Sequence, residues 1–555
     1  MDREASADRP NGVPAAEVQG ARERSRLLAR AGTVGAGTLV SRALGLLRDV
    51  TLAALFDRDA TDAWWVAFTI PNFLRQLLGE GAVSSAVVPL LSEKLSREGD
   101  EAARRFFAHV RGASVVALAA VTVLGVVFAR PLTELFAGGY RDRPGELERT
   151  VTLTRVVFPY IAFMGTAALG MAALNAKRRF AVAAFAPGLL NVAMLVAAFS
   201  LRAPLRALGC DPVLALAVGA LAGGFLQVVA QWPALRAIGF ADAPRFAVND
   251  DVRRVLRRMA PLTLGIGIYS IDLVLSRRFL SGLGVGAQSY FSMAMRLCDF
   301  PQGVFVMALS TAALPSLSGL AARGARGELA KTWAHGFGLA TFVALPTSAL
   351  LVTLSEPIVV AIFQHGVFDA HAAHETARAV FWQGGAIWTV AAVRQTVPAF
   401  YALGDSRTPV LVSAVDLCAF IALAIALRDP MGHAGISAAV AGSSAVQMVL
   451  LLACLRWRMG TLCADALLRS AWRTLAASGT AAIAAWGAVR LAASDTAAAG
   501  AIARMWPGLA GSLAFGGVFF AVAWGVEAPE LDEILAFVQR RRAHRPSQSG
   551  AEATR

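Results

Sequence analysis

Residues 82–97 of the chain read AVSSAVVPLLSEKLSR, and residues 308–323 read ALSTAALPSLSGLAAR. A weaker pair consists of ALNAKR at 173–178 and ALGDSR at 402–407. We interpret these pairs as an internal repeat. The alternative is chance similarity, because apolar helices rich in Ala, Leu and Ser align easily. Without a gap, the two longer stretches coincide at Ala82/Ala308, Ser84/Ser310, Ala86/Ala312, Pro89/Pro315, Leu91/Leu317, Ser92/Ser318 and Arg97/Arg323.

Long apolar runs surround these stretches. The chain has 555 residues, of which 56% are hydrophobic and 16% charged, whereas soluble domains carry about 25% charged residues. An apolar run of roughly 20 residues spans the bilayer core as a helix. The runs predict about fourteen transmembrane helices, at residues 32–56, 63–91, 107–136, 150–174, 181–202, 211–237, 255–281, 286–318, 333–354, 377–402, 408–427, 434–455, 471–492 and 507–526.

The offsets of the repeat match the distances from the second predicted helix to the eighth and from the fourth to the tenth. We therefore predict an all-α, polytopic membrane protein with two six-helix lobes, related by an axis along the membrane normal, plus two C-terminal helices. Two lobes around a central cavity favour transport by alternating access. The expected segments are a cytoplasmic N-terminal tail (1–31), an N-lobe (32–240), a C-lobe (241–458), two C-terminal helices (459–530) and a cytoplasmic C-terminal tail (531–555).

The net charge of +14 comes from small basic clusters between the apolar spans. These clusters fall mainly in alternate loops, which by the positive-inside rule predicts that both termini are cytoplasmic. The loop with Arg141, Arg143 and Arg149 is the main exception, although acidic residues accompany it. Nucleic acid is not an expected partner, because no recognition motif and no contiguous basic face accompany the charge.

Several charged residues fall inside the predicted spans. A charge at the bilayer centre costs about 2.5–3.5 kcal/mol, so such residues usually face a cavity or a partner. For the acids, we favour pairing with neighbouring arginines. For the arginines, we favour binding of an anionic substrate such as a diphosphate, because the planar guanidinium grips phosphate with two hydrogen bonds. In the first, second and eighth predicted helices these residues are Arg42, Arg48, Asp49, Asp62, Arg75, Glu80, Arg296 and Asp299.

Three further charged residues are candidates for energy coupling: Asp272, Asp416 and Arg394. Either acid could take a coupling proton or cation, or pair with Arg277, Arg278 or Arg394. No cofactor and no metal site are expected. The HAAHE at 371–375 lacks the HExxH order of zinc peptidases, and the GxxGxG at 32–37 follows no strand, so close helix packing is its ordinary interpretation.

The chain also resembles a known family, the lipid II flippases (MurJ/MviN) of the multidrug/oligosaccharidyl-lipid/polysaccharide exporter superfamily. The first two of the motifs that carry this resemblance are specific. The motifs are SRALGLLRD (41–49), ATDAWWVAFTIPNFLRQLLGEGAVSSAVVPLLSE (60–93), FPY (158–160), NAKRRF with FAPGLLN (175–191), FPQGVF with LPSLS (300–318) and FYALGDSRTPV (400–410).

The resemblance implies a cationic central cavity between the lobes and a groove for an isoprenoid tail along the last two helices. It implies that Arg42, Arg48, Arg75 and Arg296 contact a lipid diphosphate. Ser41, Asp62 and Ser289 match positions that the family uses in or near the cavity. Asp49, Glu80 and Asp299 would support the arginines, although SMAMRLCD (292–299) departs from the family pattern around Arg296.

These observations predict a non-enzymatic flippase of the bacterial inner membrane. Its expected cargo is lipid II, the undecaprenyl-diphosphate-linked disaccharide-pentapeptide, and its drive a coupling ion or the membrane potential. Membrane lipids and the cell-wall synthesis and division machinery are the expected partners. The alternatives are a flippase for another undecaprenyl-diphosphate-linked glycan, a membrane glycosyltransferase and a scaffold. The short loops argue against an enzyme, and arginines inside the membrane argue against a scaffold.

Overall fold

The computed structural model describes residues 15–76, 82–247, 249–269, 271–493, 500–533 and 535–536. Over these residues the regular structure is helical, without strands. Nine helical segments in this part of the chain are long and apolar enough to cross a membrane. The chain is therefore a multi-pass helical membrane protein, as its apolar spans predicted.

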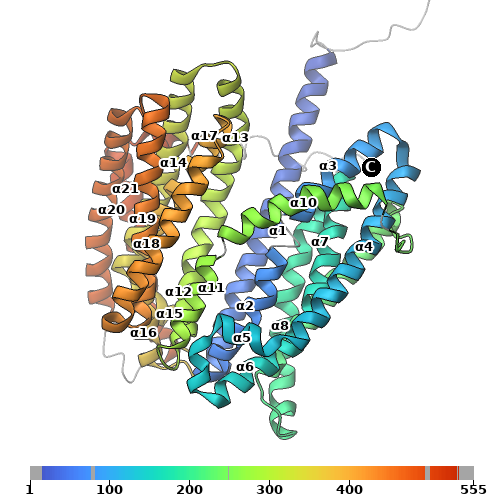
Figure 1. The fold of residues 1–555 in the computed structure, drawn as a ribbon. Helices are drawn as coiled ribbons and strands as arrows, with labels where there is room; N and C mark the ends of the chain where they lie inside the picture. The colour runs from blue at the N-terminus through green and yellow to red at the C-terminus, as the bar shows by residue number, and fades with distance from the viewer. Residues whose placement is uncertain are drawn as a thin grey trace, which may run out of the picture.

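The first group of helices, which we call the N-lobe, runs from α1 to α9. Within it, α8 packs along both α1 and α9, and α7 packs on α3, α4 and α9. Figure 1 shows this group on the right, in blue to green. Its elements are α1 (Ala15–Leu55), α2 (Arg58–Arg75), α3 (Ala82–Arg97), α4 (Gly99–Val127), α5 (Ala129–Phe136), the 3-10 helix η2 (Gly138–Asp142), α6 (Pro144–Val157), α7 (Tyr160–Ala176), α8 (Phe180–Ala207) and α9 (Leu214–Ala237).

The second group, the C-lobe, begins after a linker. Its main bundle pairs α18 with α19, α14 with α17 and α12 with α16, but α10 lies against α3 and α4 of the N-lobe. Its elements are α10 (Asp250–Tyr269), α11 (Ile271–Ser281), α12 (Ala287–Pro301), the π-helical turn η3 (Gln302–Val306), α13 (Met307–Ala322), α14 (Arg326–Thr353), α15 (Ser355–Phe363), α16 (Ala370–Gly385), α17 (Ile387–Ala402), α18 (Arg407–Met431) and α19 (His433–Met459).

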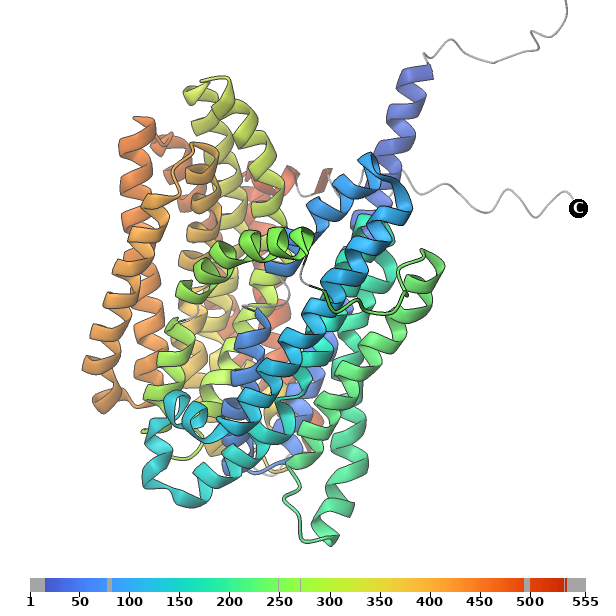
Figure 2. The same ribbon diagram turned by 45° about the vertical axis from the view of Figure 1, so that its right-hand side comes forward.

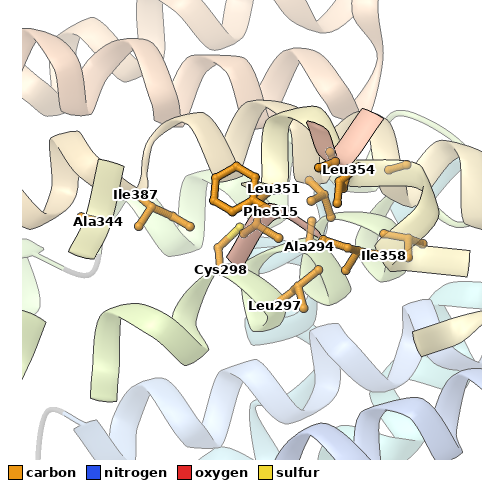
Figure 3. Packing of buried hydrophobic residues seen from close by; sticks show 14 of the residues in the cluster. Ala294, Leu297, Cys298, Ala344, Leu351, Leu354, Ile358, Ile387 and Phe515 are labelled. Carbon is orange, nitrogen blue, oxygen red and sulfur yellow. The ribbon is translucent and has the colours of Figure 1, made fainter. Parts of the chain in front are cut away.

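The last two helices, α20 (Ala464–Ala492) and α21 (Ala501–Gly525), pack on the outer side of α14 and α15. Phe515 of α21 joins Leu351, Leu354 and Ile358 in the largest buried apolar cluster of the described residues (Figure 3). The same cluster contains Ala294, Leu297 and Cys298 of α12, so apolar packing fixes α12 against the body of the C-lobe.

Several helices differ from the predicted spans. Helix α1 begins at Ala15, inside the segment expected to be a tail. The predicted third, fourth, eighth and tenth spans are each divided into shorter helices, as α6 and α7 are. The second and seventh spans are also described as two helices each, and residues between those helices lie outside the described ones. The predicted boundaries marked apolar stretches, and such stretches do not reveal breaks inside a span. The count of fourteen spans and the segment boundaries therefore stay predictions.

The two lobes lie closest at one end of the molecule. Figure 1 shows them converging at its lower end, near α2, α5, α12 and α15, and spreading toward the end from which α1 protrudes. At the lower end the backbone amide of Val367 donates to the carbonyl of Ala54 over 3.1 Å, which joins the C-lobe to the end of α1. We call this end, with residues 54–62, 134–143, 278–290 and 365–369, the closed end.

Candidate functional site

A cavity of about 610 Å³ lies between the lobes. Helices α1, α2, α7, α8 and α9 form its N-lobe side, and α12, η3 and α17 its C-lobe side. Its charged lining residues in the described chain are five arginines and one aspartate: Arg42, Arg48, Arg75, Arg296, Arg394 and Asp299. Ser41 also lines it. The structure thus brings together the four arginines predicted to bind substrate, with a fifth that was predicted as a coupling residue.

Asp49 organises the centre of this arginine set. Its side chain is fully buried, and Oδ1 accepts hydrogen bonds from Nε and Nη2 of Arg48 at 2.8 and 2.7 Å. Its other oxygen, Oδ2, forms an ion pair of 2.8 Å with Nε of Arg296 on α12. One carboxylate therefore holds arginines from both lobes in fixed positions. Asp49 thus lies behind the lining of the cavity and contacts two arginines, and its supporting role stays a prediction.

Asn191 on α8 completes the support of α1. Its Oδ1 accepts from Nη1 of Arg48 at 2.9 Å, and its Nδ2 donates to the carbonyl of Ser41 at 3.0 Å. Arg48 consequently directs its donors to Asp49 and Asn191, whereas the Arg296 side chain is 40% exposed. Arg296 is therefore free to offer donors to a ligand, and Arg48 is largely committed to positioning α1 and α8.

Arg42 reaches across the cavity to the other lobe. Its Nη1 donates to the carbonyl of Asp299 at 3.0 Å. Its guanidinium packs on Gly303 in η3, where a Cβ would collide with it. The π-helical turn and its glycine therefore make the space that Arg42 occupies, in keeping with the frequent use of such turns at functional sites.

Two other arginines complete the set. Nε of Arg75 at the end of α2 donates to Oδ1 of Asn72, one turn earlier, at 2.9 Å. Arg394 of α17 faces the cavity from the C-lobe, and its backbone carbonyl accepts from the Ser310 hydroxyl at 2.8 Å. Glu80, predicted as a supporting carboxylate, lies outside the described residues.

Asp62 and Ser289 do not line the cavity but join the lobes at the closed end. The carboxylate of Asp62 accepts from the backbone amides of Gly286 and Ser289, at 2.7 and 2.8 Å, and from the Ser289 hydroxyl at 2.6 Å. Asp62 thus caps α12 from the opposite lobe, where the positive end of the helix dipole favours a carboxylate. Gly286 has a φ of 91°, which glycine adopts without strain.

Other contacts at the closed end were not predicted. Arg58 forms an ion pair of 2.6 Å with Asp369 and donates to the Tyr290 hydroxyl at 3.3 Å. Arg143 donates to the carbonyl of Ser281 at 2.6 Å, and Arg278 to that of Glu134 at 3.0 Å. Partners this far apart along the chain leave no local sequence signal.

The two candidate coupling acids lie in the C-lobe, away from the cavity. Asp272 lies on α11 and Asp416 on α18, two helices that pack against each other. Neither forms an ion pair among the described residues, so the suggested pairing with Arg277, Arg278 or Arg394 does not occur there. Arg277 instead donates to the side chains of Gln288 and Ser292, at 3.0 and 2.6 Å.

Asn191 and Gln227 are among the polar residues of the cavity that sequence reasoning missed. Both side chains are buried, and the amide of Gln227 has no hydrogen-bond partner within the described part of the chain. A signal existed for both, because each interrupts a long apolar run. A polar residue in the middle of a membrane span is a functional candidate even without a charge.

A multi-pass helical protein with two lobes around a polar internal cavity has the architecture of a secondary transporter. The family model described as lipid II flippase MurJ matches residues 52–505 of this chain. The chain belongs to this family.

Curated relatives and solved structures agree with this assignment. The lipid II flippase MurJ of Burkholderia cenocepacia is 33% identical over 435 residues, which cover 77% of this chain and 83% of that protein. A probable lipid II flippase MurJ of Rhizobium meliloti is 31% identical and covers 93% of this chain and 96% of its own length. A solved lipid II flippase MurJ in an inward closed conformation has the same fold, with a TM-score of 0.71, 21% identity and coverage of 89% of this chain and 99% of that one. An inward-facing MATE-family multidrug transporter shares the fold with a TM-score of 0.60 and 14% identity, covering 77% of this chain and 95% of its own.

Proposed function

We propose that this chain is a lipid II flippase, which moves undecaprenyl-diphosphate-linked disaccharide-pentapeptide from the cytoplasmic to the periplasmic leaflet for peptidoglycan synthesis. The observation that carries the proposal is the cavity with five arginines from both lobes. Among the described residues, two carboxylates, Asp49 and Asp299, lie with these arginines. The excess of guanidinium groups suits a diphosphate, which accepts paired hydrogen bonds from planar donors.

The arginines of the cavity would have different roles in binding the substrate. Arg42 and Arg296 lie on opposite lobes and both face the cavity, so a diphosphate between them would draw the lobes together. Arg75 and Arg394 extend the positive lining, and Asn72 and Gln227 add neutral groups for the sugar and peptide parts of the head. The isoprenoid tail would stay in the lipid, where α20 and α21 present exposed apolar side chains such as Ile483 and Leu513.

The orientation follows from the basic loops. The end from which α1 protrudes is the cytoplasmic side in this proposal, and the closed end is the periplasmic side of the inner membrane. Asp62, Ser289 and Arg58 then form the periplasmic closure, and the described state is one that receives substrate from the cytoplasm. Transport requires these interlobe contacts to break while the cytoplasmic ends approach each other.

The candidate acids for energy coupling lie outside the lining of the cavity. Asp272 and Asp416 are the candidates for a coupling proton or cation. They lie on packed helices, and neither has an ion-pair partner in the described part of the chain, which favours a positive ion near them. The membrane potential is an alternative drive, worth about 2.3 kcal/mol per charge per 100 mV. Replacing Asp272 with Asn removes one acid, and unchanged transport with unchanged ion dependence would exclude it.

Complementation of flippase-depleted bacteria tests the function. Wild-type protein should restore growth, and Ala at Arg42, Arg75 or Arg296 should abolish rescue at equal membrane expression. Lys at the same positions should rescue poorly, because an ammonium cannot replace the bidentate fork. Arg97, whose partner is Glu93 on the surface at 3.4 Å, is the matched control and should tolerate Ala. If expressed wild type does not rescue, another undecaprenyl-diphosphate-linked glycan becomes the better cargo.

A further inference from the structure

Helix α10 differs from the long helices in direction and composition. Figures 1 and 2 show it running from the C-lobe to the N-lobe, across the long helices rather than along them. In a multi-pass bundle, a helix that runs across the spanning helices lies in the plane of the membrane. Its sequence begins DDVRRVLRRM and is not among the candidate spans of the described chain.

One face of α10 is apolar and packs on the N-lobe. Val252 and Val255 are 2% and 4% exposed, and Met259 packs with Val255 against the apolar cluster of α3 and α4. At 100° per residue, these three positions share one side of the helix. The opposite side carries Arg253, Arg254, Arg257 and Arg258, all exposed.

The arginines of α10 differ from their neighbours in one respect. Arg253 has Asp250 at 3.8 Å, and nearby on α3 and α4 Arg97 has Glu93 at 3.4 Å and Arg105 has Glu101 at 3.9 Å. Arg254, Arg257 and Arg258 have no carboxylate partner in the parts of the chain that the structure describes. Three unneutralised charges thus share one exposed face of an in-plane helix.

From this geometry we infer that Arg254, Arg257 and Arg258 form a docking surface for the head groups of anionic phospholipids in the adjacent leaflet. Basic amphipathic helices in the membrane plane bind such head groups through their charge. The surface is distinct from the substrate cavity, because Arg254, Arg257 and Arg258 are not among the residues that line that cavity. Lipid bound there would hold α10 in the membrane plane. It would therefore favour the conformation in which α10 and α11 are not collinear.

The test measures phosphatidylglycerol binding to the purified full chain by native mass spectrometry, without any lipid-linked sugar. The variant carries Arg254→Gln, Arg257→Gln and Arg258→Gln. Its matched control carries Arg97→Gln, Arg105→Gln and Arg253→Gln, which removes the same charge from ion-paired positions. A third variant with Lys at positions 254, 257 and 258 keeps the charge. Unchanged thermal unfolding excludes misfolding of each variant.

The docking surface predicts a loss of phosphatidylglycerol affinity of roughly tenfold or more in the Gln variant, since each surface arginine contributes roughly fivefold. The control and Lys variants should bind like wild type, and phosphatidylcholine binding should be equal in all four proteins. Equal phosphatidylglycerol binding by the Gln variant and wild type would overturn the inference. So would a Gln variant that keeps phosphatidylglycerol but loses lipid II, because the arginines would then belong to the substrate path. The measurement does not depend on transport, so it separates failure of this inference from failure of the proposed flippase function.

Discussion

Asp49 on α1 and Arg296 on α12 form an ion pair of 2.8 Å between the two lobes, in the wall of the central cavity. The aspartate is fully buried and also holds Arg48, whereas the Arg296 side chain is 40% exposed. The pair therefore positions Arg296 at the cavity and joins the lobes at the same point. A substrate diphosphate would compete with Asp49 for Arg296, which couples binding to the contact between the lobes.

Replacing Asp49 with Asn should destabilise the protein and stop transport. The change leaves Arg48 buried without a counter-ion, which costs about 3 kcal/mol or more when one partner of a buried pair is removed. Thermal unfolding in detergent measures this as a lower Tm. Glu93→Gln breaks an exposed ion pair and serves as the control, with an expected change within about 0.5 kcal/mol. Equal Tm values for the Asp49 and Glu93 variants would show that the buried pair does not hold α1.

Replacing Asp62 with Asn should loosen the closed end. The carboxylate accepts three hydrogen bonds from the start of α12, and bonds to a charged acceptor contribute about 1.5–3 kcal/mol each. Hydrogen–deuterium exchange over residues 286–292 should become roughly tenfold faster or more. Asp59, exposed on the same helix, is the matched control. Unaltered exchange in the Asp62 variant would argue that this contact does not close the lobes.

Replacement by alanine should change the stability of the protein differently at Gly37 and at Gly35, both on α1. A Cβ at Gly37 would lie 2.7 Å from the backbone oxygen of Ala184 on α8, whereas nothing lies within 4 Å of one at Gly35. Gly37→Ala should therefore lower the free energy of unfolding by about 1–3 kcal/mol. Gly35→Ala should be neutral or slightly stabilising through helix propensity. Thermal unfolding of both variants checks the prediction, which fails if Gly37→Ala is as stable as Gly35→Ala.

Asp405, in the turn before α18, should contribute pH-dependent stability. Hydrogen bonds from Thr408, at 3.0 Å from its backbone amide, and the nearby Arg458 lower the pKa of Asp405 below its ordinary 3.8. A lowered pKa in the folded state means that the stabilisation is present above about pH 4 and disappears as the pH falls through the folded pKa. The Tm of wild type should thus exceed that of Asp405→Asn at pH 7, and the gap should shrink toward pH 3. A gap that is constant over this range would contradict the prediction.

Composition and apolar run length predicted much of the fold, because a membrane span requires a long apolar helix. The arginines of the cavity were predictable for a related reason, since charge inside a span needs a polar environment. The direction of α10 across the long helices was not, because α10 packs against α3 and α4, far from it in the sequence. Asp62 was predicted to lie in or near the cavity, but its position at the closed end depends on Gly286 and Ser289, more than 200 residues away.

We propose that the arginine cavity carries a lipid-linked diphosphate across the bilayer. The most direct measurement is the flipping of fluorescent lipid II in proteoliposomes that contain wild type, Arg42→Ala, Arg296→Ala or the surface control Arg97→Ala. We expect wild type and the Arg97 variant to flip the lipid. Each cavity variant should flip it roughly tenfold to a hundredfold more slowly, because that is the loss expected when one charge-assisted contact is removed. Cavity variants that flip lipid II at the wild-type rate would contradict the proposal.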